Sequence, residues 1–375
     1  MSNEALYQER LARVKKAINL EPVDRIPVAF LGPAFAPRYM GMPLAKFCED
    51  AEAALQVTLE AVKRLDVDAV NALVVGRFPL ILILSWLSHV RIPGQELPPD
   101  ALWQVDEAEV MTPEDYDFIV ENGWQAFLNQ HLPKVVDPAY LGESLAWAGA
   151  NMSRGVPLFR ENGYVVIASG ALTIPFEHMC GARSMSKFFF DLYRMPDRVQ
   201  AAMDRALPEI IAGGIGLAKA GGAMGTWVGG WRAASAMIAP KLWNRFVWPY
   251  YLKIVEALLA ANITPVLHWD QDWTRDLVRL QELPAKKCIL NLDGMTDTRK
   301  FKELVGDRMA LMGDVPASLF AAGTPEDIYN YVRDLVRDVG PTGLILSSGC
   351  DIPVNAKPEN VEAFVAASRE YGKVG

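Results

Sequence analysis

Cysteine is scarce in this sequence and never forms a close pair. The four cysteines, Cys48, Cys180, Cys288 and Cys350, lie far apart in a chain of 375 residues, and no CxxC motif occurs. Secreted domains that depend on disulfides carry dense cysteine frameworks, which this spacing does not provide. The sequence therefore predicts reduced thiols and a cytoplasmic protein.

Long apolar runs are also lacking. The N-terminal segment MSNEALYQERLARVKK carries charges throughout and has no apolar core of the secretory type. The most apolar stretch, Phe78 to Leu87, lies between Arg77 and Arg91. Its roughly ten residues fall short of the ~20 that a membrane-spanning helix needs. We therefore expect no membrane partner, and a buried strand or core helix at this stretch.

Positive charge is in deficit as well. Lys and Arg number 37 against 45 Asp and Glu, which gives a net charge of −8. A nucleic-acid-binding surface needs an excess of cations, so nucleic acid is excluded as the main partner. The glycine-rich loops GxGxxG and GxxxxGK[ST], which mark many nucleotide sites, follow none of the predicted strands.

What is present is a large apolar core and a regular alternation of strands and helices. Hydrophobic residues make up 51% of the chain and charged residues 22%, as in globular proteins. Eight short β-like runs alternate with helical patterns; these runs are 25–31, 68–75, 164–168, 225–228, 263–268, 288–292, 309–312 and 343–346. Eight such units predict an α/β fold, a single (β/α)8 TIM barrel over residues 1–375. An open doubly wound sheet is the alternative.

Two segments stand outside this alternation. Tyr7, Leu11, Val14 and Ile18 are spaced as on one face of a helix, which predicts an N-terminal helix over about residues 3–20. Roughly 90 residues separate the second and third strands, far more than an ordinary loop contains. We therefore expect an inserted segment with structure of its own, at about residues 77–162, over the mouth of the barrel.

The sharpest chemical signal lies at the predicted carboxyl ends of the strands, where barrels carry their active sites. His268 ends the fifth strand, and Asp270 follows at the spacing that points both side chains the same way. Cys350 follows the eighth strand on the same rim. Imidazole, carboxylate and thiolate are all zinc ligands, so these three predict a zinc site. A hydrogen-bonded histidine without a metal is the alternative for His268.

Further polar and aromatic side chains follow other strands at this rim. They are Glu177, Trp231, Arg232, Trp269, Asp272, Asp293 and Asp314. Trp231 and Trp269 are expected to form a wall for a flat aromatic or macrocyclic ligand. Arg232 is expected to hold a carboxylate or phosphate, or else to form a structural ion pair. Turn capping is the alternative for Asp293 and Asp314.

Four short segments resemble the uroporphyrinogen decarboxylase superfamily. They are VLHWD (266–270), GDVP (313–316), GCDIP (349–353) and KPENV (357–361). The resemblance covers nearly the whole chain and implies a (β/α)8 barrel. The decarboxylases of this superfamily carry an arginine-rich N-terminal stretch that holds porphyrinogen carboxylates, and only Arg38 and Tyr39 of it survive here. A polyanionic substrate needs several fixed cations. A uroporphyrinogen decarboxylase-like lyase is therefore only an alternative.

The other branch of the superfamily contains corrinoid-dependent methyltransferases, whose zinc site pairs a His-x-Cys motif with a distant Gly-Cys. The resemblance places His268 and Cys350 at two of these ligands, with Asp270 where the family has its first cysteine. A carboxylate makes the metal harder and better matched to an oxygen ligand than to a thiol. The resemblance therefore implies O-demethylation, which moves a methyl group from a methoxylated, aromatic substrate to a Co(I) corrinoid. Methyl transfer from a methylcobamide to a thiol such as coenzyme M is the alternative.

The resemblance also implies roles for the other rim residues. Glu177 is expected as a further zinc ligand, and Asp272 or Asp314 is expected to orient a ligand histidine or supply a proton. The substrate-binding side chains are expected to be Trp231, Arg232, Trp269 and Asp293. No corrinoid-binding motif of the D-x-H-x-x-G type occurs, so the cobamide is expected on a partner protein. A homodimer is a possible assembly.

Overall fold

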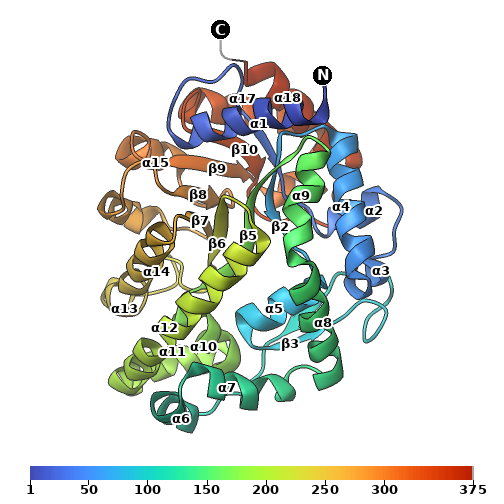
Figure 1. Ribbon diagram of the computed structural model, residues 1–375. Helices are drawn as coiled ribbons and strands as arrows, with labels where there is room; N and C mark the ends of the chain where they lie inside the picture. The colour runs from blue at the N-terminus through green and yellow to red at the C-terminus, as the bar shows by residue number, and fades with distance from the viewer. Residues whose placement is uncertain (374–375) are drawn as a thin grey trace.

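Eight parallel strands close into a barrel with helices around the outside (Figure 1). The computed structural model describes residues 1–373. The strands pair in the order β1-β10-β9-β8-β7-β6-β5-β2. They are β1 (Val28–Phe30), β2 (Ala69–Leu73), β5 (Val165–Thr173), β6 (Gly225–Gly230), β7 (Thr264–Trp269), β8 (Ile289–Leu292), β9 (Ala310–Val315) and β10 (Leu344–Ser348). The predicted (β/α)8 barrel is confirmed, and the open sheet is wrong because β1 pairs with both β2 and β10.

The helices fall into a ring around the barrel and a group between β2 and β5. Those of the ring are α2 (Phe35–Tyr39), α3 (Leu44–Glu49), α4 (Ala51–Leu65), α10 (Pro175–Arg183), α11 (Met185–Arg194), α12 (Pro196–Gly221), α13 (Pro240–Phe246), α14 (Trp248–Ala260), the 3-10 helix η3 (Thr274–Glu282), α15 (Thr298–Val305), α16 (Ala317–Ala322), α17 (Pro325–Val339) and α18 (Pro358–Tyr371). The N-terminal helix α1 (Asn3–Ile18) belongs to neither group. Several of these helices begin at a residue whose side chain caps the free backbone N–H groups of the first turn. At α17, Thr324 accepts a bond from the Asp327 N–H, and the Asp327 carboxylate accepts one from the Thr324 N–H, which forms a capping box.

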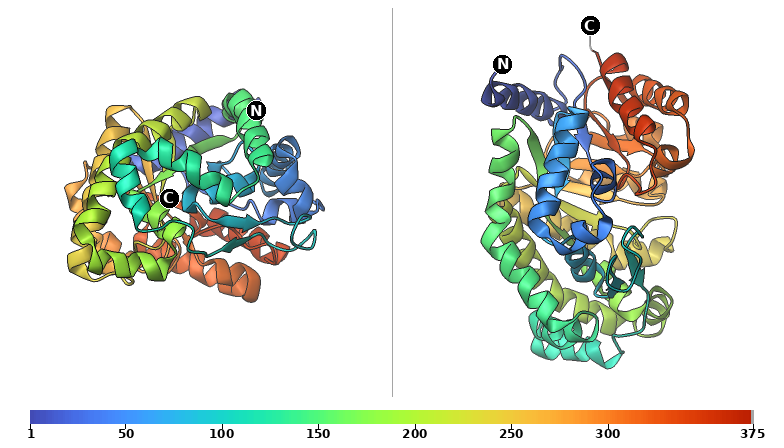
Figure 2. Two further views of the ribbon diagram at one scale, coloured as in Figure 1. Left: turned by 90° about the horizontal axis from the view of Figure 1, so that it is seen from below. Right: turned by 90° about the vertical axis from the view of Figure 1, so that its right-hand side faces the viewer.

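Residues 74–164, between β2 and β5, form structure of their own (Figure 2). Most of it lies at one end of the barrel, and α9 returns along the side of the barrel to α1. The elements are α5 (Phe78–Trp86), an antiparallel pair β3 (His89–Arg91) and β4 (Gln104–Asp106), α6 (Glu114–Asn122), α7 (Trp124–His131), η1 (Leu132–Lys134), α8 (Pro138–Asn151), η2 (Met152–Arg154) and α9 (Gly155–Glu161). The most apolar stretch of the sequence is the helix α5. Its C-terminal end lies on α10 at Gly181, where a Cβ would come 1.9 Å from the Trp86 carbonyl oxygen.

The opposite end of the barrel is closed by α1, which lies across it in Figure 1. Val14, Ala17 and Ile18 of this helix join a buried cluster with side chains from inside the barrel; these are Ala29, Ala69, Val165, Ile167, Val266, Ile289, Met312 and Ile345. This half of the lumen is therefore solid apolar core. Within the part of the lumen formed by residues 1–373, the space for a ligand lies at the carboxyl ends of the strands, beside α5.

Strand β5 runs five residues further than the sequence pattern predicts. Its pairing with β6 is irregular between Ala168 and Ala171, and Gly170 adopts φ +73 there. That region of φ is open to glycine and strained for most other residues. The strand therefore carries two small residues, Gly170 and Ala171, into the region where the ligand space opens.

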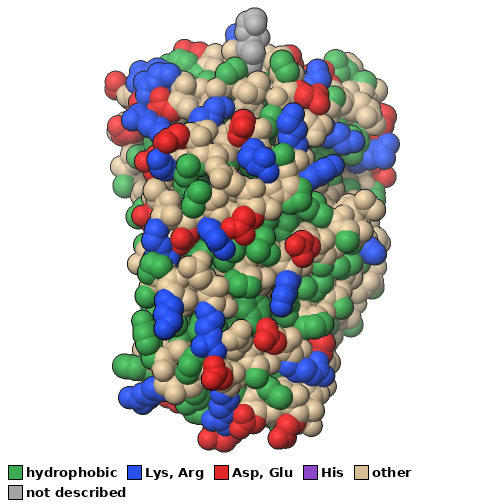
Figure 3. All heavy atoms as spheres, turned by 90° about the vertical axis from the view of Figure 1, so that its left-hand side faces the viewer, with side chains coloured by type: hydrophobic (Ala, Val, Ile, Leu, Met, Phe, Trp, Pro, Cys, Tyr) green, Lys and Arg blue, Asp and Glu red, His purple; other side chains and the backbone are tan. Residues whose placement is uncertain are grey.

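The surface agrees with the charge balance of the sequence. On the face drawn in Figure 3, basic and acidic side chains are interspersed and do not gather by sign. Within residues 1–373, no helix combines the length and the apolar character needed to cross a bilayer.

A buried carboxylate ties α1 to the first two strands. Asp68, just before β2, is 1% exposed. It accepts bonds from Arg13 Nη1 at 2.8 Å, from both Nη atoms of Arg25 at 2.6 and 2.7 Å, and from the Val28 N–H at 2.9 Å. One side chain thus connects the helix that closes the barrel to β1 and β2.

We expect Asp68→Asn to lower the free energy of unfolding by about 3–5 kcal/mol, because it leaves the buried Arg13 without its buried partner. Urea unfolding followed by circular dichroism measures this. Asp24→Asn is the matched control: Asp24 also bonds Arg13, but its side chain is 65% exposed, so the expected loss is below about 1 kcal/mol. Equal losses in the two variants would contradict this account of Asp68.

Candidate metal centre

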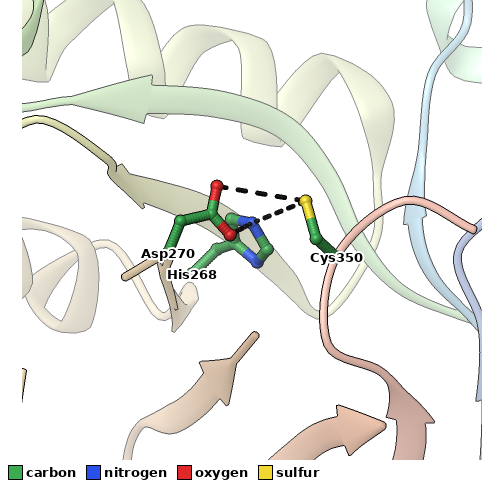
Figure 4. Close-up of side chains that lie close together, drawn as sticks. All are labelled: His268, Asp270 and Cys350. Carbon is green, nitrogen blue, oxygen red and sulfur yellow. Dashed lines mark hydrogen bonds and ion pairs between the residues drawn. The ribbon is translucent and has the colours of Figure 1, made fainter. Parts of the chain in front are cut away.

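Three side chains converge where β7 and β10 end. His268 belongs to β7, Asp270 follows it, and Cys350 follows β10 (Figure 4). His268 Nε2 lies 3.2 Å from Asp270 Oδ1 and 3.7 Å from Cys350 Sγ. Cys350 Sγ lies 3.9 Å from Asp270 Oδ2. One ligand atom from each residue therefore lies within 4.8 Å of the other two.

These separations suit a small tetrahedral metal ion. Zinc bonds of about 2.1 Å to nitrogen or oxygen and about 2.3 Å to sulfur place ligand atoms roughly 3.3–3.6 Å apart. The measured separations of 3.2–3.9 Å, which involve both carboxylate oxygens of Asp270, are close to this range. With three protein ligands, the fourth position of a tetrahedral ion is left for substrate or water, as in catalytic zinc sites. The triad is therefore compatible with zinc.

The orientation of His268 is fixed by Asn291 of β8. His268 Nδ1 lies 2.8 Å from Asn291 Oδ1. The positions of Oδ1 and Nδ2 of Asn291 cannot be exchanged without losing a hydrogen bond, because Nδ2 donates to the carbonyl of Met312 at 3.0 Å. Nδ1 of His268 must therefore carry the hydrogen that it donates to Oδ1, and Nε2 is directed at Asp270 and Cys350. Metal-binding histidines are commonly held in this way.

Two further residues inside the barrel support this arrangement. The Trp227 ring of β6 stacks on the His268 ring, with centroids 4.0 Å apart and planes at 7°. Trp227 Nε1 donates to Asn71 Oδ1 at 3.0 Å, and Asn71 Nδ2 donates to Asn291 Oδ1 at 3.1 Å. The imidazole is thus held both in its plane and along its edge.

The electrostatics of the triad favour a bound cation. Asp270 Oδ1 is buried and has no hydrogen-bond donor among the described residues. Burial, together with the nearby Asp270 charge, raises the pKa of the Cys350 thiol well above its usual value. Burial lowers the pKa of His268, but Asp270 and Asn291 outweigh it and the net pKa is raised. A divalent ion would bind Asp270 Oδ1, and its positive charge would lower the pKa of the Cys350 thiol, so that the thiolate forms readily. The residues present therefore fit a metal.

The triad lies on the wall of a cavity of about 260 Å³. The other lining side chains are mostly apolar and come from the strand ends and the loops after them, from α3 and α4, and from the segment after β2. They include Phe30, Phe47, Val70, Leu73, Phe78, Ile81, Leu82, Trp86, Trp103 and Trp231, with Thr58, Ser85 and Asp351 as further polar members. Within residues 1–373, no lysine or arginine lines this cavity.

The two tryptophans that the sequence predicts as a ligand wall, Trp231 and Trp269, lie in different places in the structure. Trp231 lines the cavity, edge-on to Trp86 with centroids 5.3 Å apart. A Cβ on Gly229 would come 2.3 Å from the Trp231 ring, so the ring rests on that glycine. Trp269, the other aromatic side chain expected to bind substrate, does not line the cavity. It follows His268 on β7 and points to the other face of the strand, where it is 1% exposed and stacks on Trp273 at 4.3 Å.

Glu177 is not a metal ligand in this structure, which corrects the expectation. It is fully buried on α10. Its Oε1 accepts backbone N–H bonds from Trp231, Arg232 and Ala233 at 2.7–2.9 Å. Its lone pairs are thus used to hold the loop after β6. Burial raises the pKa of Glu177, and these backbone bonds oppose that rise.

Arg232 lies behind the cavity wall. Its guanidinium is 5.5 Å from the centroid of the Trp86 ring, and it does not line the cavity. The expectation that it holds a substrate anion therefore has no support in this geometry.

The predicted aspartates outside the triad also face elsewhere. Asp272 caps a turn, accepting the Thr274 N–H at 2.8 Å. Asp293 accepts the N–H groups of Gln271 and Met295 at 2.8 and 2.9 Å. Asp314 is buried against α17, where Oδ1 accepts the Tyr331 hydroxyl at 3.0 Å. None of the three lines the cavity. The geometry therefore shows structural contacts for these three side chains and gives no support to the expected catalytic roles of Asp272 and Asp314 or to substrate binding by Asp293.

The sequence reasoning missed Asn71, Trp227, Asn291 and Asp351. A signal existed for two of them, because Asn71 and Asn291 each interrupt an otherwise apolar strand. A lone amide inside a buried strand needs a partner, and here the partners meet across the lumen. Asp351 adjoins Cys350 and lines the cavity, and burial raises its pKa well above the usual value.

Fold and site together define a (β/α)8 protein with a histidine, a carboxylate and a thiol at the active end of the barrel. The family model for uroporphyrinogen decarboxylase (URO-D) matches residues 9–75 and 158–371. The chain belongs to this family. The unmatched stretch between the two ranges holds α5, the β3–β4 pair and α6 to α8.

Individual relatives are distant. The uroporphyrinogen decarboxylase of Geobacter sulfurreducens is 24% identical over 363 residues, covering 91% of this chain and 93% of that protein. The human uroporphyrinogen decarboxylase is 28% identical over 144 residues, covering 36% of this chain and 38% of that one. Among solved structures, a methyltransferase from Methanosarcina mazei has a TM-score of 0.71 at 19% identity and covers 96% of this chain and 98% of its own. That likeness establishes the shared fold.

The hydrogen bond from His268 to Asn291 generates a prediction about the metal. Asn291→Ala removes the acceptor that orients the imidazole, so we expect zinc affinity to fall about 10- to 100-fold. Competition with a chromophoric zinc chelator measures this on the purified chain. Asn244→Ala, at an exposed position of α13, is the control and should leave the affinity unchanged. An unchanged affinity in Asn291→Ala would show that the amide does not support a metal ligand.

The buried Asp314 generates a prediction about pH and stability. Burial raises the pKa of Asp314 to about 7, whereas the unfolded chain releases this proton near pH 4. The carboxyl therefore destabilises the fold progressively as pH rises from about 4 to about 7. Asp314→Asn should therefore raise the free energy of unfolding, and with it the melting temperature, by a smaller amount at pH 5 than at pH 8, and the gain at pH 8 should be on the order of a few kcal/mol.

Calorimetry at the two pH values tests this expectation. Asp307→Asn, at an exposed position, should give the same small change at both. A gain from Asp314→Asn that is equal at pH 5 and pH 8 would refute the proposed titration.

Proposed function

We propose that this protein moves a methyl group from a methoxylated aromatic substrate to the Co(I) corrinoid of a partner protein, in a zinc-dependent O-demethylation. The observation that carries the proposal is a triad of metal-ligand side chains on the wall of an apolar, aromatic-lined cavity. The resemblance to methyltransferases of this superfamily and the Methanosarcina mazei methyltransferase of the same fold support it.

The roles of the chain's own residues follow from the geometry. His268, Asp270 and Cys350 would hold the zinc ion, and Asn291 keeps His268 directed at it. The ion would act as a Lewis acid toward an ether or phenolic oxygen, so that the departing phenolate is stabilised. Trp86 and Trp231 provide faces and edges against which a ring can pack. The apolar lining displaces water from the reacting ether, which strengthens every charge interaction there.

The ligand set favours an oxygen-bearing substrate over a thiol. Thiolate-rich zinc sites suit the activation of a thiol, whereas a carboxylate ligand leaves the metal more Lewis acidic. Asp270 in the triad therefore argues against methyl transfer to a thiol such as coenzyme M. The absence of lysine and arginine from the cavity wall, among residues 1–373, argues against decarboxylation of a porphyrinogen, whose carboxylates need cationic partners.

The test is methyl transfer from 2-methoxyphenol or 1,2-dimethoxybenzene to a Co(I) corrinoid protein, followed by the absorbance change of the corrinoid. We expect the zinc-loaded protein to be active, and His268→Ala and Cys350→Ala each to lose activity by more than about 100-fold. Cys288→Ala and His89→Ala are the matched controls. Cys288 is buried at β8 and His89 is on β3, so both variants should keep their activity.

Two outcomes would reject the proposal. One is a purified protein that neither holds nor takes up zinc. The other is unchanged transfer in His268→Ala and Cys350→Ala. Activity confined to methanol or a methylated thiol would move the protein to a different substrate class.

A further inference from the structure

The size of the cavity limits the substrate to a single ring. A cavity of about 150 Å³ accommodates benzene, and pockets for drug-sized ligands run from about 300 to 1,000 Å³. The value here is about 260 Å³. One benzene ring with one or two methoxy groups fits this space. Small residues make the room, among them Ala72 on β2 and Gly170 and Ala171 on β5, which all line the cavity.

The charges around the cavity limit the substrate further. Asp270 and Asp351 line it, and no lysine or arginine does so within residues 1–373. Asp351 supplies no positive charge in either protonation state. The guanidinium of Arg232 lies 5.5 Å from the centroid of the Trp86 ring, and Arg232 is not among the residues that line the space. A carboxylate on the substrate would therefore enter an apolar wall without a partner, which costs several kcal/mol.

The metal centre does not supply the missing positive charge. A divalent ion held by the Asp270 carboxylate and the Cys350 thiolate would have both of its charges neutralised, because His268 binds as a neutral imidazole. The centre would then be neutral overall and would not attract an anionic ring by net charge. This distinguishes the cavity from sites that hold carboxylated rings with arginine forks.

We infer that this cavity selects uncharged methoxyarenes and rejects rings that carry a carboxylate. The inference rests on the function proposed above, since it names the substrate class of the same site. The cavity discriminates between substrates by the net charge of the substituted ring. A carboxamide of the same size and shape as the carboxylate is accepted better, because it can be buried at a far lower cost.

Binding of two nearly isosteric probes tests this without any methyl transfer. The probes are 3,4-dimethoxybenzamide and 3,4-dimethoxybenzoate, titrated calorimetrically into the zinc-loaded full chain at neutral pH. We expect the amide to bind about 100-fold more tightly, or better, than the benzoate. Equal affinities, tighter binding of the benzoate, or binding of neither probe would each overturn the inference.

A pair of variants on α5 extends the test. Ser85 is half-buried and lines the cavity. Ser85→Lys adds a cation, and Ser85→Met adds a side chain of similar length without charge. We expect the benzoate to bind at least about tenfold more tightly to Ser85→Lys than to Ser85→Met. No difference between the two would contradict a selection by charge. If Ser85→Lys fails to fold, the two probes on the unaltered protein still decide.

The outcomes separate this inference from the proposed function. Selective binding of the amide without any transfer to a Co(I) corrinoid protein would reject O-demethylation and leave the selectivity standing. Transfer from methoxybenzoates as efficient as from neutral methoxyarenes would confirm the reaction and overturn the selectivity.

Discussion

Closure of the parallel sheet is the constraint on which the metal centre depends. His268 is on β7 and Cys350 follows β10, with β8 and β9 between them. In a flat sheet, three strand spacings of about 4.8 Å would separate these ends by roughly 14 Å. In the barrel, Cys350 Sγ lies 3.7 Å from His268 Nε2. The same closure brings Asn71 of β2 to Asn291 of β8 at 3.1 Å. Both the triad and its supporting network therefore exist only because the sheet curves back on itself.

The burial of this triad has an electrostatic cost that shapes its chemistry. A carboxylate, a thiol and an imidazole share a region where desolvation raises the pKa of Cys350. Unpaired acidic groups in such a place destabilise a fold unless a cation or protons neutralise them. Asn291 limits this cost by fixing which nitrogen of His268 faces the acids. The site is thus arranged around a positive charge that the side chains themselves do not supply.

The segment after β2 turns the open end of the barrel into a cavity. Phe78, Ile81, Leu82, Ser85 and Trp86 of α5 line it, at the spacing of one helical face. The end of α5 packs closely on α10 at Gly181, because the Trp86 carbonyl leaves no room for a side chain at that position. The family model passes over most of this segment. The barrel therefore provides the three side chains that could hold a metal, and a segment outside the family match provides much of the wall.

The sequence by itself determined the eight strands, the barrel and the convergence of His268, Asp270 and Cys350, because alternation, length and the His-x-Asp spacing are local properties. It did not determine the roles of Glu177, Trp269, Asp272 or Asp314, although all of them lie at or after the carboxyl ends of strands. Which face a side chain takes depends on strand parity, irregularities such as that at Gly170, and the neighbouring helix. Trp269 packs against Trp273, and Glu177 holds the loop after β6. The tertiary structure decided these roles, because a side chain that bonds backbone N–H groups or packs on an apolar surface is not free to face the cavity.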